Sequence, residues 1–259
     1  MTKSKKKANI VGRQTYEPMS AKCPHCGSTK IVKNGFSYYG KQNYKCKHCK
    51  RQSVERAPEQ VYGQRYLIGK LLLERISLRG ICRTLEMSMC ALMSIVKEMW
   101  QAVPAELPVG DLADAQVEVF CVEADEMWSF VGSKDNVHWI WLAIERKTRL
   151  VVGFHIGDRT QQDAQALKLS IPDHLLDKAI FFTDGLAAYQ SVFDKVQHYP
   201  EGKPETVKIE RLNNTIRQRC SRLVRKGLSF SKSRLYHYMA VYFFLVNYNI
   251  ETMAKMASL

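Results

Sequence analysis

The stretch "KAIFFTDGLAAYQ", residues 178–190, decides the fold of this chain. Residues 179–182 are apolar without alternation, which predicts a strand buried on both faces in the parallel part of a sheet. Thr183, Asp184 and Gly185 follow at once. Ligands of an open α/β sheet bind where its parallel strands end, so Asp184 is a candidate site residue.

Three runs rich in β-forming residues precede this stretch, and short turn signals separate them. They are residues 117–128 ("VEVFCVEADEMW"), 137–145 ("VHWIWLAIE") and 150–157 ("LVVGFHIG"). Thr160 and Asp163 then form a capping-box pattern that predicts a helix over residues 161–170. A three-stranded meander, a helix, a strand and a short helix predict an α/β fold.

Residues 207–227 predict an amphipathic helix that ends at Gly227. Its apolar face consists of Ile209, Leu212, Ile216, Cys220 and Leu223. A polar stripe of Glu210, Asn213 and Arg217 lies beside this face. Residues 231–256 predict a final packed helix.

Three acids are candidates for one site: Asp125, in a run that also holds Glu123 and Glu126, Asp184 and Glu210. Converging carboxylates repel one another unless cations of high charge lie between them. All-oxygen ligands favour Mg²⁺ or Mn²⁺ over zinc, and two such ions support in-line phosphoryl transfer. Any one of these acids, taken singly, is more often a solvated surface group or a helix cap.

The net charge of +14 over 259 residues favours a polyanionic partner such as nucleic acid. The charge is segregated, because residues 105–184 hold more acids than bases between a basic head and a basic tail. No secretory signal is visible, and the run "MAVYFFLV" is too short to span a bilayer. We therefore expect no membrane partner, a cytosolic location, and cysteines that are thiols or metal ligands.

Two Cys-x-x-Cys motifs nineteen residues apart predict a four-cysteine zinc ribbon. Its ligands are Cys23, Cys26, Cys46 and Cys49. So short a segment buries little apolar surface, and structural zinc supplies the missing folding free energy. A redox role suits one such pair but not two beside a basic hairpin. The remaining cysteines, Cys82, Cys90, Cys121 and Cys220, are expected in the core.

Cations interleaved with aromatic residues make the ribbon a candidate DNA-binding surface, although many zinc ribbons are purely structural. The candidate DNA contacts are Lys30, Lys33, Lys45, Lys47 and Arg51. Residues 76–100 follow with the pattern of a helix-turn-helix, in which Ser77 and Ser88 cap the two helices. Ser94 and Lys97 would contact DNA from the second helix, and the alternative is a plain helical hairpin.

Over nearly its whole length the chain resembles the transposases of the bacterial insertion sequence 1 family. The matching segments are "CPHCGS…CKHCK", "ADEMWSFVGSK", "TDGLAAY" and "IERLNNTIRQRCSRLVRKGLSFSKS". The resemblance implies a ribonuclease H-like catalytic domain whose metal-binding triad is Asp125, Asp184 and Glu210, with Arg217 contacting DNA near the cut. That family often divides its DNA-binding and catalytic parts between overlapping reading frames, whereas here one chain holds both.

Five regions are expected on this basis. They are a basic flexible tail (1–20), a zinc ribbon (21–56), a helix-turn-helix region (57–103), a linker (104–116) and the ribonuclease H-like catalytic domain (117–259).

The favoured function is DNA transposition: binding of element ends, then metal-dependent strand cleavage and strand transfer. The expected partners are double-stranded DNA, as terminal inverted repeats and target, and at least a second copy of the chain. Its expected place is the nucleoid of the bacterial cytoplasm. The alternatives are a zinc and helix-turn-helix regulator without catalysis, and a ribonuclease H-like nuclease that does not join strands.

Overall fold

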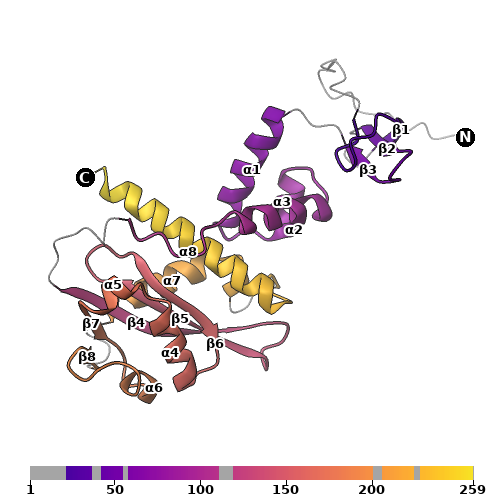
Figure 1. Ribbon diagram of the computed structural model, residues 1–259. Helices are drawn as coiled ribbons and strands as arrows, with labels where there is room; N and C mark the ends of the chain where they lie inside the picture. The colour runs from indigo at the N-terminus through magenta and orange to yellow at the C-terminus, as the bar shows by residue number, and fades with distance from the viewer. Residues whose placement is uncertain are drawn as a thin grey trace, which may run out of the picture. The chain divides into compact units, whose positions relative to one another are not determined.

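The computed structural model describes residues 22–36, 42–54, 58–110, 119–200, 206–224 and 228–258 (Figure 1). The chain forms two compact units, Met1–Gly63 and Gln64–Leu259, and each is described by itself. The predicted tail over residues 1–20, residues 111–116 of the predicted linker, and Gly227 lie outside the described residues.

The first unit contains a small antiparallel sheet in the order β1-β2-β3. Its strands are β1 (Ile31–Phe36), β2 (Gln42–Cys46) and β3 (Gln52–Val54). Almost every residue of β1 is exposed, whereas Cys23 and Cys46 are buried. These strands therefore stabilise the unit little through apolar burial, as the sequence predicts for a metal-dependent fold.

The second unit is built on a five-stranded sheet in the order β6-β5-β4-β7-β8. Its strands are β4 (Phe120–Phe130), β5 (Val137–Glu145), β6 (Val151–Gly157), β7 (Ala179–Phe182) and β8 (His198–Tyr199). Strands β4, β5 and β6 form the predicted antiparallel meander, and β7 pairs parallel to β4. The predicted α/β class is confirmed.

Eight helices accompany the strands in the described ranges. They are α1 (Pro58–Leu72), α2 (Leu78–Thr84), α3 (Met89–Gln101), α4 (Gln161–Leu169), α5 (Asp173–Leu176), α6 (Ala187–Gln190), α7 (Val207–Arg219) and α8 (Arg234–Met256). The predicted caps are confirmed, because the hydroxyls of Ser77, Ser88 and Thr160 accept backbone N–H groups three residues on. None of these helices combines the length and apolar character needed to cross a bilayer.

Helix α7 is shorter than the sequence predicts. It ends at Arg219, where Cys220 takes an extended conformation, and a 3₁₀ turn over Ser221–Leu223 follows. The change of direction still brings Cys220 and Leu223 into the core, so all five predicted apolar positions are buried. The pattern of apolar residues identified the buried side chains correctly but not the point at which the helix ends. Strand β8 and helix α5 were not predicted.

The sheet separates two clusters of buried residues, because successive side chains of a strand point to opposite faces. On β4, Val122 and Ala124 belong to the cluster that α4 and α6 cover. Met127 belongs to the cluster that α7 and α8 cover. Figure 1 shows α8, in yellow, running across the sheet with α7 beside it. Asp125, which shares the face of Met127, therefore lies on the side where α7 packs.

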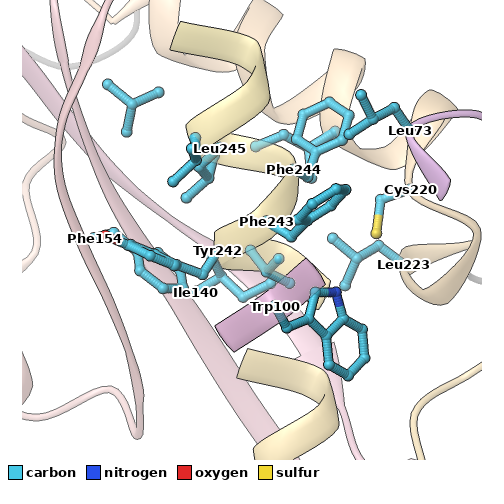
Figure 2. Packing of buried hydrophobic residues seen from close by; sticks show 14 of the residues in the cluster. Leu73, Trp100, Ile140, Phe154, Cys220, Leu223, Tyr242, Phe243, Phe244 and Leu245 are labelled. Atoms are coloured by element: carbon cyan, nitrogen blue, oxygen red, sulfur yellow. The ribbon is translucent and has the colours of Figure 1, made fainter. Parts of the chain in front are cut away.

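The helices before residue 104 share the larger of these cores. Trp100 of α3 and Leu73, just after α1, lie in one cluster with Ile140 of β5 and Phe243 of α8 (Figure 2). The hydroxyl of Tyr242 donates to the backbone carbonyl of Ala105 at 2.8 Å. In the second unit, α2, α3 and α8 are thus parts of one packed body.

A buried amide fastens α8 to the sheet. Asn249 has no solvent exposure, and its Oδ1 accepts the N–H of Val151 at 2.8 Å. Its Nδ2 donates to the carbonyls of Val151 and Pro108. One side chain therefore joins α8, β6 and the segment that precedes β4.

Replacing this amide should be costly. We expect Asn249→Ala to lower the free energy of unfolding by about 2–4 kcal/mol, because buried backbone groups lose their partners. Asn247→Ala is the matched control, since its amide donates to Phe243 within α8, and it should cost less than about 1 kcal/mol. Urea unfolding followed by circular dichroism measures both, and equal effects would contradict the role of Asn249.

Candidate functional site

The sheet topology brings three carboxylates together at the end of β7. The pairing of β7 with β4 ends at Phe182 opposite Glu123, and beyond this point no strand of the described residues pairs with that side of β4. Asp184 follows β7 and turns toward this open edge. Asp125, Glu126 and Asp184 each place a carboxylate oxygen within 4.8 Å of the others. The structure thus brings the predicted Asp125 and Asp184 together and adds Glu126 to them.

Glu126 is the most deeply held of these acids. Its side chain is 1% exposed. The hydroxyl of Tyr189 donates to its Oε2 at 3.0 Å, and Nε of Arg159 donates to its Oε1 at 2.7 Å. Arg159 Nη2 also lies 3.9 Å from Asp184 Oδ2. We call Asp125, Glu126 and Asp184 the acidic centre.

Burial and mutual repulsion raise the proton affinity of two carboxylates of the acidic centre. Burial raises the pKa of Asp125 to about 6, and the negative charges of Asp184 and Glu210 add to the rise. Burial likewise raises the pKa of Glu126 to about 7, with a further contribution from Asp184. The pKa of buried Tyr189 lies well above its usual value. A second positive charge brought to this centre would relieve the repulsion.

Helix α7 is positioned against the acidic centre by Glu123. The Oε2 of Glu123 accepts the backbone N–H groups of Lys208 at 2.8 Å and Ile209 at 2.9 Å. Its Oε1 accepts from Nε of Arg146 at 2.9 Å. A carboxylate at the first turn of a helix satisfies unpaired N–H groups and interacts favourably with the helix dipole.

The predicted residues of α7 occupy three different environments. Glu210 is exposed on the first turn, outside the 4.8 Å group, although its charge contributes to the raised pKa of Asp125. Asn213 is only 9% exposed, and its Nδ2 donates to Asp125 Oδ2 at 2.7 Å. Arg217 Nη2 donates to the carbonyl of Trp128 at 3.3 Å. The exposure expected of a DNA-contacting side chain is therefore not found for Asn213.

These side chains fit a hard divalent cation. The donor set consists of carboxylate oxygens, which Mg²⁺ and Mn²⁺ prefer. Beside it, Asn213 Oδ1 is buried and makes no hydrogen bond within the described residues. Such an atom costs free energy unless a ligand or a water pairs with it.

The four predicted zinc ligands form a second cluster, in the first unit. The sulfurs of Cys23, Cys26, Cys46 and Cys49 all lie within 4.8 Å of one another. Sγ of Cys23 is 3.6 Å from that of Cys49, and Sγ of Cys26 is 3.7 Å from that of Cys46. Tetrahedral ligands with Zn–S bonds of about 2.3 Å would place sulfurs roughly 3.8 Å apart. The cluster has the size that zinc requires.

Of the four other cysteines, which the sequence places in the core, two are buried. Cys82 and Cys220 are buried, but Cys90 is exposed and Cys121 is partly exposed. The expected core position of Cys90 was wrong, because it lies on the outer face of the first turn of α3, away from buried Leu92.

The candidate DNA contacts outside α7 all lie at the surface. These exposed residues are Lys30, Lys33, Lys45, Lys47, Arg51, Ser94 and Lys97. Lys97 also lies over the ring of Tyr236, 5.9 Å from its centre. Their exposure leaves them accessible to a phosphate backbone, and their role in binding stays a prediction.

Sequence reasoning missed Glu126, Arg159, Tyr189 and Glu123 as members or supports of the site. Neighbouring residues of a strand point to opposite faces, so Asp125 and Glu126 are not expected to converge. They do so because β7 ends early and leaves the edge of β4 open. The repeated acids of "VEADE" were the signal in the sequence that could have identified Glu123 and Glu126.

Two family models match the chain. The model described as IS1 transposase, of the Asp-Asp-Glu type, matches residues 118–250. The model of the InsA N-terminal domain, a zinc ribbon, matches residues 19–50. The ribonuclease H-like fold expected from the sequence is consistent with this family, and the zinc-ribbon match and the four-cysteine cluster together indicate a structural zinc site.

Curated relatives agree with these matches. Insertion element IS1 4 protein InsB of Escherichia coli K12 is 38% identical over 116 residues, which cover 44% of this chain and 67% of the relative. The iso-IS1n InsB protein of Shigella dysenteriae is 39% identical over 112 residues, covering 43% of this chain and 82% of the relative. IS1 InsB of Shigella flexneri is 38% identical over 115 residues, which cover 44% of this chain and 86% of the relative.

The raised pKa of Asp125 predicts a pH-dependent stability. Below about pH 3 the Asp125 carboxyl is protonated in both the folded and the unfolded state, so it contributes no difference in stability. Between its usual pKa and its raised pKa of about 6, the unfolded state loses the proton more readily, so the folded state becomes progressively less stable as the pH rises. Without divalent cations, Asp125→Asn should therefore raise the Tm at pH 8 by about 5 °C and leave it nearly unchanged at about pH 3. Asp135→Asn, in the exposed turn after β4, is the control in thermal melts. A lower Tm for Asp125→Asn at pH 8 would contradict the assignment.

Removal of zinc should affect only the first unit. We expect a chelator, or Cys46→Ser, to abolish the protection of β1 and β2 amides from hydrogen exchange, because little apolar surface supports these strands. Amides of β4 and β5 should stay protected. Persisting protection of β2 in zinc-free protein would show that the metal is not needed for folding.

Proposed function

Because the chain belongs to the IS1 transposase family, we propose that it cuts DNA at the ends of an insertion element and joins the freed ends to target DNA. The observation that carries this proposal is the convergence of Asp125 and Asp184 at the open edge of β4, with α7 fixed beside them. Membership of the family supports the assignment as a transposase, and the steps of strand cleavage and strand joining are what we propose in addition.

The proposed catalytic residues are Asp125, Asp184 and Glu210. A divalent cation held by such carboxylates activates an attacking oxygen and neutralises charge that develops on the phosphate during in-line displacement. Asp184 is 41% exposed and thus accessible to DNA, whereas Asp125 is oriented by the amide of Asn213. Glu210 would approach from the first turn of α7, which Glu123 holds in place.

Positively charged surfaces would hold the DNA. The transposase and zinc-ribbon matches imply DNA binding, and we propose that the exposed cations of the ribbon contact phosphates. We assign base contacts to Ser94 and Lys97 of α3, and a contact near the cut to Arg217. Pairing of two element ends requires at least two copies of the chain on DNA. The five regions expected from the sequence, and the nucleoid location, stay predictions.

A single substitution tests the catalytic assignment. Asp184→Asn should lower strand cleavage at least 10³-fold, because an amide cannot replace a charged ligand, and should change DNA affinity by less than about twofold. The assay uses a labelled duplex from the DNA flanking the gene, with Mg²⁺, and measures binding, cleavage and joining separately. Asp177→Asn is the control, since Asp177 is an exposed acid just before β7.

The three readouts separate the competing functions. Cleavage with joining is the expected result for the wild-type protein. Binding without cleavage would indicate a regulator, and cleavage without joining would indicate a nuclease. Cleavage retained by Asp184→Asn would overturn the site assignment.

A further inference from the structure

Arg159 lies over the acidic centre, in a place that the proposed function does not use. It follows β6 and directly precedes Thr160, the cap of α4. Its guanidinium donates to Glu126 at 2.7 Å and approaches Asp184 to 3.9 Å. The same group lies 4.8 Å from the centre of the Trp139 ring. Two carboxylates and an aromatic ring therefore hold one cation at the edge of the candidate site.

The two carboxylates differ in their freedom to move. Glu126 is held in place by burial and by the hydrogen bond from the hydroxyl of Tyr189, so it is a fixed partner for the guanidinium of Arg159. Asp184 follows the end of β7 and is 41% exposed. Arg159 itself is 42% exposed, so its guanidinium can turn to solvent while its stem stays in place.

Arg159 carries a positive charge, as a metal cation does, and its guanidinium lies beside Glu126 and Asp184 of the acidic centre. Three carboxylates within 4.8 Å repel one another, and the guanidinium relieves this repulsion for two of them. A divalent cation on Asp125 and Asp184 would do the same and would repel the guanidinium at close range. The two positive groups therefore compete for one set of carboxylates.

We propose that Arg159 is a phosphate-binding residue of this site, which neutralises Glu126 and Asp184 until a divalent cation binds and then turns to a phosphodiester of the DNA. The proposal rests on the proposed function. A guanidinium suits this role because its planar donors match two phosphate oxygens, and Trp139 can keep it at the rim of the site. No proton or electron is transferred in this change of partner.

The proposal predicts opposite effects on metal binding and on catalysis. Arg159→Met removes the competing charge, so Mn²⁺ should bind about three- to tenfold more tightly to the full chain. Cleavage should fall at least tenfold, because one phosphate contact is lost. Arg159→Lys keeps the charge but not the planar fork, and its Mn²⁺ affinity should stay within twofold of the wild type. Lys147→Met, an exposed cation after β5, is the control.

Calorimetry measures Mn²⁺ affinity without any turnover. A salt titration of DNA binding gives an independent measure, because each phosphate contact contributes roughly 0.9 to the slope of log affinity against log salt. With Ca²⁺ present, Arg159→Met should lower this slope by about 0.9 relative to the wild type. Without divalent cations the two slopes should agree, since Arg159 then pairs with Glu126.

A purely structural salt bridge would behave differently. Unchanged or weaker Mn²⁺ binding by Arg159→Met, or an unchanged slope with Ca²⁺, would overturn the proposal. If Arg159→Met does not fold, Arg159→Gln gives the same comparison with a polar side chain. Failure of the catalytic assignment appears instead as cleavage by Asp184→Asn, which involves no change at Arg159.

Discussion

The position of α7 against the sheet of the second unit depends on one buried carboxylate, that of Glu123. It is 2% exposed, and it binds two backbone N–H groups at the start of α7 and the guanidinium of Arg146. A buried charge of this kind is tolerated only when hydrogen bonds and an opposite charge satisfy it. Because Glu123 lies two residues before Asp125 on β4, the same strand carries the acid and positions the helix that supplies Glu210 and Asn213. The register between strand and helix is thus part of the site.

The two units obtain their stability from different sources. In the second unit, apolar side chains of α2, α3, β5 and α8 share one cluster, so the predicted DNA-binding helices are packed on the five-stranded sheet. In the first unit, four sulfurs replace such a core. A change in the packing of α3 would therefore also disturb α8 and the sheet, whereas the structural effect of losing zinc would be confined to the ribbon.

The elements predicted with most success were those that local chemistry specifies. Serine and threonine caps, the meander and the apolar strand at Ala179–Phe182 depend on neighbours in the sequence, and the structure contains all of them. Helix α7 shows the limit of this reasoning, because its apolar pattern continues to Leu223 while the helix ends at Arg219. An apolar pattern indicates which side chains point into the core, but it does not determine whether the backbone that carries them is an α-helix or a turn.

The sequence by itself determined the four-cysteine cluster, from the spacing of its motifs, the α/β class, and Asp184 as a residue at the end of a strand. It also singled out Asp125 as a candidate for the same place, on its acidic run and on the family resemblance. Only the tertiary structure decided that Glu126 joins them, that Asn213 is buried against Asp125, and that Arg159 pairs with the acids. The physical reason is that these contacts connect residues from β4, α7 and the turn after β6, whose distances depend on the register in which β7 pairs with β4 and on how Glu123 caps α7. No local pattern of residues encodes those two facts.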